Sequence, residues 1–319
     1  MAALPLVIPS PLHQLEDIFP FHCWIKRDDL IHHEISGNKY RKLKYLIQFA
    51  QDQLKKGILT FGGPFSNHIY ATAAYTHLIE MPSAGIIRGD QDWNNPTIRF
   101  AMDKGMKIHC INRKEYKNKN SEAILEVLYS YPEYLVIPEG GYHTLALQGV
   151  NEIVEELDFI PDYIACSIGT GATAAGLLRG IARKGWSTKL MAFASMKNKS
   201  LRDQILKLAG ISESNQLLVM EDFHRGGYAK LDSELLNYSE WFVKHSGIKL
   251  DPIYTLKMLF GLEQLSRIGY FKPEDRVLIY HSGGIQGWNG INYLLKKKPN
   301  VARNSKQVIS SLFSSIPGV

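Results

Sequence analysis

The chain has 319 residues, of which 45% are hydrophobic and 21% charged, so it can bury a large core and is not a disordered protein. Its net charge of +6 and its isoelectric point near 9.0 come from basic residues scattered among acidic ones, which argues against nucleic-acid binding. It contains no run of about 18 apolar residues and begins without the features of a signal peptide, so we expect no membrane association.

The three cysteines, Cys23, Cys110 and Cys166, are too widely spaced for a disulfide framework or a metal knuckle. Each lies in an apolar run, as a small core residue would. Together with the missing signal peptide, they predict a protein of the reducing cytoplasm. The histidines show no ligand spacing such as HExxH, so no catalytic metal is expected.

The first predicted elements lead to a lysine, Lys39. Residues 21–27 form an extended segment, and a helix opens after the small, capping-competent residues 36–38. Lys39 therefore lies in the first turn of a helix, where the macrodipole tends to lower the pKa of an amine. A neutral amine is what Schiff-base chemistry requires.

An alternative interpretation of the same helix needs no chemistry. Lys39, Arg41, Lys42 and Lys44 would form a solvated basic face, opposite a buried stripe at helical spacing. The stripe consists of Tyr40, Leu43, Leu46 and Ile47. From this segment alone, both interpretations stay open.

From residue 58 onward, short apolar segments alternate with amphipathic ones. Strands are predicted at residues 58–61, 83–88, 106–111, 134–137, 163–167, 190–195, 216–220 and 277–280. Helices are predicted at residues 67–79, 96–104, 122–131, 145–157, 173–183, 201–208, 233–245 and 256–268, and a helix-like segment at 291–295 precedes Lys296–Lys298. This alternation predicts an α/β fold with parallel sheet, and the number of units favours two αβα lobes with mostly parallel, twisted sheets.

Glycine or small polar residues follow five of the predicted strands or connections. These places are residues 62–68, 140–143, 167–173, the region of Tyr254, and 281–284. Active sites in such folds lie at the carboxyl ends of strands. So many glycines at these ends indicate that the backbone approaches a ligand closely.

The strongest of these segments is residues 167–173, Ser-Ile-Gly-Thr-Gly-Ala-Thr, between a predicted strand and helix. A glycine-rich turn that leads into a helix N-terminus offers backbone N–H groups to a phosphate. It is neither a Walker loop nor a Rossmann fingerprint, so a single phosphate without magnesium is the better fit. The alternative is an ordinary tight turn.

A second candidate is residues 61–68, where Ser66 and Asn67 start a helix. They are ordinary N-cap residues, or they place Ser66 at a strand end with free N–H groups for a carboxylate. Tyr228 and Tyr254 are further candidates, although spacing alone does not separate them from core tyrosines.

Taken together, these stretches resemble the pyridoxal-phosphate enzymes of fold type II, the tryptophan synthase β-like group. Within it, the chain is most similar to the D-cysteine desulfhydrase and 1-aminocyclopropane-1-carboxylate deaminase subfamily. The matching stretches are Lys26–Leu30, Gly37–Lys39 with Arg41–Leu43, Ser66–His68, Arg88–Gly89, Pro138–Gly141, Gly169–Thr173, Asp251–Thr255 and His281–Gly284.

The resemblance implies a cofactor, pyridoxal 5'-phosphate, held in the cleft between the two lobes. Lys39 would form a Schiff base with it and later move a proton. The cofactor's phosphate would lie on Gly169, Thr170, Gly171, Ala172 and Thr173. Lys42 would add charge from one turn along the helix, whereas Arg41 and Lys44 would stay on the solvated face.

The resemblance also assigns roles around the substrate. Asn67 would bind the ring hydroxyl, and Ser66 with the backbone after it would take the substrate carboxylate. Ser66 is also a candidate acid–base group, and Tyr254 and Tyr228 match two active-site tyrosines. The family's deaminases carry a glutamate at the ring nitrogen where this chain has Thr255, so Ser282 would face that nitrogen.

A hydroxyl at the ring nitrogen makes the cofactor a weaker electron sink than a carboxylate does. That favours β-elimination of a good leaving group from a small amino acid, with D-cysteine giving pyruvate, ammonia and sulfide. Deamination of 1-aminocyclopropane-1-carboxylate to 2-oxobutyrate is the alternative. A non-catalytic amino-acid binder on the same fold is a second alternative.

Three stretches depart from the family pattern, all near the expected substrate pocket: residues 31–36, Tyr70, and Tyr142 with His143. They leave the cofactor chemistry intact and put the identity of the substrate in doubt. The family arrangement predicts a large cofactor-binding domain of residues 1–52 and 153–319, a small inserted domain of residues 53–152, and a homodimer.

Overall fold

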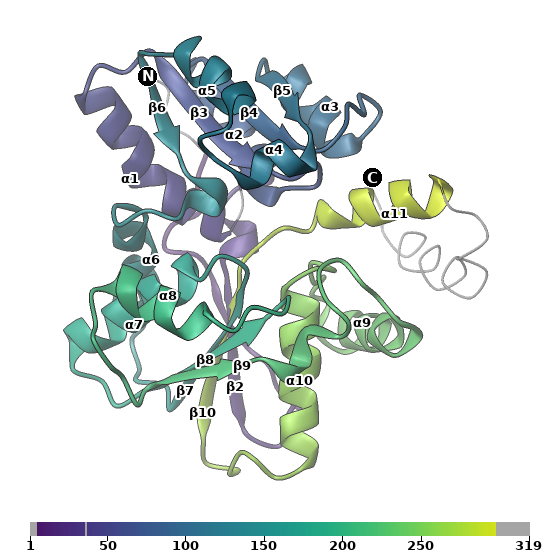
Figure 1. Ribbon diagram of the computed structural model, residues 1–319. Helices are drawn as coiled ribbons and strands as arrows, with labels where there is room; N and C mark the ends of the chain where they lie inside the picture. The colour runs from purple at the N-terminus through teal and green to yellow at the C-terminus, as the bar shows by residue number, and fades with distance from the viewer. Residues whose placement is uncertain (1–4, 36, 298–319) are drawn as a thin grey trace.

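The computed structural model describes residues 5–35 and 37–297 and shows two lobes, each built on one sheet with helices packed against it (Figure 1). Ser36 and Lys298, which belong to predicted segments, lie outside the described residues. The two lobes lie one above the other in Figure 1, and the first helix begins between them. The predicted α/β class with two mostly parallel sheets is confirmed.

The larger sheet has six strands in the order β1-β2-β10-β7-β8-β9. Only β1 runs antiparallel to its neighbour, and the other pairs are parallel. Its strands are β1 (Leu12–Gln14), β2 (His22–Arg27), β7 (Tyr163–Ile168), β8 (Lys189–Ala194), β9 (Leu217–Met220) and β10 (Arg276–His281). Because β2, β10 and β7 are adjacent and parallel, their carboxyl ends meet at one edge.

The smaller sheet is fully parallel, with the order β5-β4-β3-β6. Its strands are β3 (Gly57–Gly62), β4 (Ser83–Arg88), β5 (Lys107–Ile111) and β6 (Tyr134–Ile137). The central strand β3 is buried along its whole length, as a strand covered on both faces should be.

The helices follow the predicted segments to within two residues at each end, except that α11 begins four residues before the predicted segment 291–295. They are α1 (Asn38–Asp52), α2 (Asn67–Leu78), α3 (Pro96–Asp103), α4 (Arg113–Lys117), α5 (Glu122–Tyr129), α6 (Ala146–Glu155), α7 (Ala172–Lys184), α8 (Leu201–Ala209), α9 (Ser233–Ser246), α10 (Thr255–Arg267) and α11 (Gly287–Lys297). Three short 3₁₀ helices occur at Asp28–Leu30, Glu139–Gly141 and Asp222–His224. The sequence analysis did not predict β1, α4 or these short turns, since they are too short to show a hydrophobic period.

Separate cores hold the lobes together. The larger sheet has one core on each face, and α7 and α10 lie in different ones. The predicted stripe of α1 is buried against Ile58 and Ile137 of the smaller sheet. All four strands of that sheet fall within the predicted inserted segment, residues 53–152. The division of the chain into domains stays a prediction. It assigns α1 to the large domain, although α1 packs against the smaller sheet.

None of the helices among residues 5–35 and 37–297 is long and apolar enough to cross a membrane.

Candidate active site

Lys39 lies where the first turn of α1 meets the carboxyl ends of the larger sheet. The N–H of Asn38 donates to the carbonyl oxygen of Ser282 (3.2 Å), which follows β10. The Asn38 side chain donates to the hydroxyl of Thr173, on α7 after β7 (2.8 Å). Gly37 has a φ of 68°, and a Cβ there would lie 1.8 Å from the carbonyl oxygen of Ser282. Only glycine fits this contact, which fixes the position of Lys39.

The amine of Lys39 has an unusually low pKa. Desolvation by the surrounding protein lowers the pKa to about 8, against the opposing effect of the carboxylate of Asp251. The side chain nevertheless keeps part of its surface accessible. A partly accessible amine that is neutral in a substantial fraction of molecules near pH 8 suits a nucleophile.

Lys42 lies one turn further along α1 and is 2% exposed. Its ammonium donates to the carbonyl oxygen of Gly140 at 3.3 Å. No carboxylate lies within 4 Å of it among the described residues. Burial and the charge of Lys39 hold the pKa of Lys42 well below its ordinary value. A buried cation without a counter-charge is costly, so this position suits an anionic ligand.

The glycine-rich loop completes the anion site. Gly171 has a φ of 86° and begins α7 without a side-chain cap, so the first N–H groups of α7 are free of side-chain acceptors. A Cβ on Gly140, whose carbonyl oxygen binds Lys42, would lie 2.9 Å from the side chain of Thr170. The loop and Lys42 therefore flank the same space, and a helix N-terminus beside a buried lysine favours a phosphate.

Arg41 is not on a solvated face, and this prediction was wrong. Its side chain is fully buried and makes paired hydrogen bonds to Asp28 and Glu156, with the shortest to Glu156 at 2.5 Å. Asp28 also accepts a hydrogen bond from the hydroxyl of Tyr280 (2.7 Å). Lys44 matches its prediction better, since it is partly exposed and pairs with Glu152. The Arg41 network ties α1 to β2, β10 and α6.

Ser66 is the N-cap of α2, as predicted. Its hydroxyl oxygen accepts from the N–H groups of His68 (3.2 Å) and Ile69 (3.3 Å), so these two are not free for a carboxylate. Asn67 faces the opposite lobe. Its side-chain oxygen accepts from Gln286 (3.1 Å), and its amide nitrogen lies 2.4 Å from a Cβ built on Gly284.

Tyr228 and Tyr254 form the aromatic wall of the site. Their rings meet edge to face at 6.1 Å. A Cβ on Gly169 would lie 3.5 Å from the hydroxyl of Tyr254, so that phenol reaches the glycine-rich loop. Burial, then the neighbouring Tyr228 and Asp251, raise the pKa of Tyr254 well above its ordinary value. Tyr254 therefore stays a neutral hydrogen-bond donor.

Two hydroxyls and one carboxylate complete the site, and the sequence analysis did not select the carboxylate. The hydroxyl of Ser282 lies 3.5 Å from that of Ser167. The hydroxyl of Thr255 is buried and lies beside the carboxylate of Asp251. Asp251 is fully buried and accepts from the N–H groups of Ile253, Tyr254 and Thr255, and burial raises its pKa. Its position before proline at the start of a helix is a capping signal that could have selected it.

The stretches that depart from the family pattern have structural partners. Tyr70 stacks on Phe100 at 3.7 Å, and the Tyr142 hydroxyl donates to the carbonyl oxygen of Gln204 at 3.0 Å. His143 accepts from the N–H of Leu145 (3.1 Å). His32 likewise accepts from the N–H groups of Glu34 and Ile35, so these side chains shape the loops that carry them.

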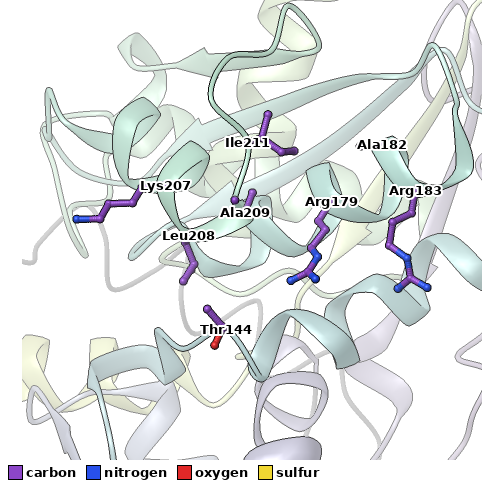
Figure 2. A pocket seen from close by; sticks show the side chains of 9 residues that line it. Thr144, Arg179, Ala182, Arg183, Lys207, Leu208, Ala209 and Ile211 are labelled. Carbon is purple, nitrogen blue, oxygen red and sulfur yellow. The ribbon is translucent and has the colours of Figure 1, made fainter.

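A hollow of about 530 Å³ on the outer face of the larger lobe is separate from this site (Figure 2). It lies between α7, α8 and Thr144, and none of the predicted site residues lines it. Its cations, Arg179, Arg183 and Lys207, lie in the second halves of α7 and α8, where the helix dipole favours them. No group of three His, Cys, Asp or Glu side chains suited to a metal ion occurs in the described part of the chain.

Comparison with known families and relatives places the chain in one family. The profile of a family described as "Pyridoxal-phosphate dependent enzyme" matches residues 3–283. The chain is 30% identical, over 88% of its length and 77% of the relative's, to a bifunctional D-cysteine desulfhydrase/1-aminocyclopropane-1-carboxylate deaminase of Arabidopsis thaliana. It is 31% identical, over 88% of its length and 95% of the relative's, to a putative 1-aminocyclopropane-1-carboxylate deaminase of Thermotoga maritima.

Solved structures show the same fold. An ACC deaminase homologue superposes with a TM-score of 0.78 at 26% identity, over 90% of this chain and 93% of that one. A hydrogen sulfide-producing enzyme of Fusobacterium nucleatum superposes with a TM-score of 0.65 at 14% identity, over 88% and 97% of the two chains. The second likeness concerns the fold alone.

Proposed function

The chain belongs to the family of pyridoxal-phosphate-dependent enzymes and is a lyase of that family, and from this we propose that Lys39 holds the cofactor as a Schiff base. The observation that carries the proposal is the pair of lysines on α1. Lys39 has a pKa lowered to about 8, and Lys42, one turn away, is buried without a carboxylate among the described residues. A nucleophilic amine beside an unfilled anion site is the arrangement that a phosphorylated aldehyde requires.

The residues present fit pyridoxal phosphate. The uncapped start of α7 and the ammonium of Lys42 would hold the phosphate. Asn67, which lies against Gly284, would hydrogen-bond the ring hydroxyl. Pyridoxal phosphate, when bound, supplies an electron sink for the bond electrons released at the substrate α-carbon.

The other side chains would position the substrate and move its protons. Lys39, once displaced by the substrate amine, would take the α-proton, which its lowered pKa allows near neutral pH. The hydroxyl of Ser66 would donate a hydrogen bond to the substrate carboxylate, because its oxygen already accepts from the N–H groups at the start of α2. Tyr228 and Tyr254, which meet at 6.1 Å, would close the pocket and donate a hydrogen bond to a leaving group.

We propose β-elimination from a small amino acid as the reaction, with D-cysteine as the substrate that gives pyruvate, ammonia and sulfide. The side chains of Ser282 and Thr255 support this choice. Both residues expected near the ring nitrogen carry a hydroxyl, and neither carries a carboxylate. A neutral hydroxyl leaves the ring nitrogen unprotonated and weakens the electron sink, which suffices for a good leaving group. The relative from Arabidopsis thaliana carries both activities in its name, so deamination of 1-aminocyclopropane-1-carboxylate is the second candidate.

The test is a panel of D- and L-amino acids and 1-aminocyclopropane-1-carboxylate, assayed for keto-acid and sulfide release. Pyruvate and sulfide from D-cysteine are expected, with visible absorbance of a Schiff base that Lys39→Ala abolishes. Release of 2-oxobutyrate from the cyclopropane, without sulfide from D-cysteine, would assign the deaminase instead. Binding of amino acids without turnover of any would leave only a non-catalytic binder.

We further propose that the enzyme works in the cytoplasm as a homodimer. The buried Cys23 and Cys166 and the half-buried Cys110 are all free thiols, which is consistent with a reducing compartment. Light scattering of the holoenzyme measures the oligomeric state.

A further inference from the structure

A cluster of charged side chains lies beside the proposed substrate pocket, at the carboxyl ends of β4 and β6. Arg88 is the last residue of β4, and Glu139 follows β6. Tyr116 organises them: its hydroxyl donates to Glu139 (3.0 Å), and its ring centroid lies 6.0 Å from the guanidinium carbon of Arg88. The ammonium of Lys119 lies 3.2 Å from the same centroid.

The cluster faces the residues proposed to position the substrate. The Arg88 guanidinium lies 3.6 Å from a Cβ built on Gly63, whose carbonyl oxygen accepts from the N–H of Ser66 (3.1 Å). The charge of Arg88 also reaches across to the opposite lobe. There burial raises the pKa of Tyr228, and Arg88 opposes that shift. Arg88 is the one exposed residue of β4 and the last of that strand, so its guanidinium lies on the solvent-exposed side of the pocket.

The cluster carries more positive than negative charge. Neither Arg88 nor Lys119 forms an ion pair with any residue of the described ranges, and Glu139 is already bound by Tyr116. Arg88 is exposed at its strand end. Contact with one aromatic ring accounts for the placement of these cations but supplies no counter-charge. Arg88 and Lys119, both exposed, and the carboxylate of Glu139 leave one net positive charge beside the substrate pocket, which favours a ligand with an anionic end group.

We propose that Arg88, assisted by Lys119, binds an anionic group at the far end of the substrate side chain, so that the enzyme prefers amino acids whose β-substituent is negatively charged. This inference rests on the proposed β-elimination and names its substrate class. Guanidinium binds a carboxylate or phosphate through paired hydrogen bonds, which selects charge and shape together.

O-Succinylserine and O-acetylserine form a matched pair of probes, because both leave as carboxylates and only the first carries a distal charge. The α-proton is removed, the Cβ–O bond breaks, and its electron pair leaves with the carboxylate. Hydrolysis of the remaining three-carbon unit then consumes one water. O-Succinylserine and water thus give pyruvate, ammonia and succinate, with no oxidant or reductant involved.

The experiment measures kcat/KM of the holoenzyme for both esters, in each enantiomer. The wild type is expected to prefer the succinyl ester by at least about tenfold, the effect of one charge-assisted contact, and added salt should reduce the preference. Arg88→Gln should bring the ratio close to one, through a loss of kcat/KM that is larger for O-succinylserine than for O-acetylserine. Arg179→Gln is the matched control, since it removes an exposed arginine from the outer face of α7 (Figure 2) and should leave the ratio unchanged.

Equal use of the two esters by the wild type, or an equal loss of both in Arg88→Gln, would overturn the inference and leave the β-eliminase intact. If neither ester nor any other amino acid is turned over, the proposed function fails. Binding then decides the inference separately: calorimetry should show glutamate bound more tightly than glutamine by the wild type and not by Arg88→Gln. Equal affinities in the wild type would refute it.

Discussion

Replacing Lys42 by methionine is expected to stabilise the protein without its cofactor and to weaken binding of pyridoxal phosphate. Lys42 is 2% exposed, and the hydrogen bond of its ammonium goes to the carbonyl oxygen of Gly140 at 3.3 Å. Methionine fills a similar volume without a charge, so the cost of burying the charge disappears. The same change removes the cation that faces the phosphate site.

The two effects have different sizes. Replacing buried charge by apolar side chains stabilises proteins by about 1–4 kcal/mol. With an unfolding entropy of roughly 2.1 cal/mol/K per residue, that raises the melting temperature of the cofactor-free protein by about 1.5–6 °C. Loss of a charge-assisted hydrogen bond of about 1.5–3 kcal/mol should weaken cofactor binding by about 10- to 150-fold.

The gain in stability should also depend on pH. The folded protein holds the pKa of Lys42 well below 10.5, so between that value and 10.5 the unfolded chain binds more protons than the folded one. The free energy of unfolding of the wild type therefore rises with pH over this range. The advantage of Lys42→Met should be larger at neutral pH than at alkaline pH and shrink as the pH approaches 10.5. In the variant, Lys39, with a pKa of about 8, still makes the free energy of unfolding rise with pH, but less strongly than in the wild type.

Differential scanning calorimetry of the cofactor-free protein and titration with pyridoxal phosphate measure both effects. Lys44→Met is the matched control on the same helix, because Lys44 is 33% exposed and pairs with Glu152 at 2.6 Å. It should change stability by less than about 1 kcal/mol and leave cofactor affinity unchanged. A less stable Lys42→Met protein with wild-type cofactor affinity would refute the argument that Lys42 awaits an anion.

Three further outcomes are expected. Arg41→Gln should destabilise the protein by about 3–5 kcal/mol, measured by chemical unfolding, because it leaves the buried carboxylate of Asp28 without its ion-pair partner, whereas Glu156 keeps Lys26; a change below about 1 kcal/mol would contradict this. Cofactor-free protein should bind pyridoxal phosphate about tenfold more slowly at pH 7 than at pH 10, because Lys39, with a pKa near 8, reacts as the neutral amine; a flat stopped-flow profile would argue against it. Gly37→Ala should lose most of its soluble yield, because its Cβ would overlap a carbonyl oxygen at 1.8 Å. Gly185→Ala is the control and should keep more of its yield, because Gly185 has a similar φ of 65° but open space around it. Equal yields of the two variants would show that the contact at Gly37 relaxes.

The fold was predictable because its signals are local. Strands such as Ser83–Arg88 and Tyr134–Ile137 were predicted to the residue, since apolar runs bounded by turn residues need no distant partner to be recognised. The positions of the glycine-rich segments at the ends of strands were predictable for the same reason. The loop after β7 follows its strand as predicted. The roles of Tyr70 and Tyr142 were not, because their partners, Phe100 and Gln204, are distant in sequence.

Arg41 and Lys42 show why the rest of the site required a structure. They are adjacent basic residues on one helix, and both are buried. Arg41 is neutralised by Asp28 and Glu156, which lie 13 and 115 residues away in sequence, and the sequence carries no signal for these pairings. Lys42 meets no carboxylate among the described residues, and that difference distinguishes a structural charge from one that awaits a ligand. Arg88 and Lys119 differ from Lys42, because both are exposed and share their cluster with Glu139. Water can solvate them without a ligand, so the proposal for the charge of the substrate depends on the net positive charge of that cluster beside the pocket and on the test with paired esters.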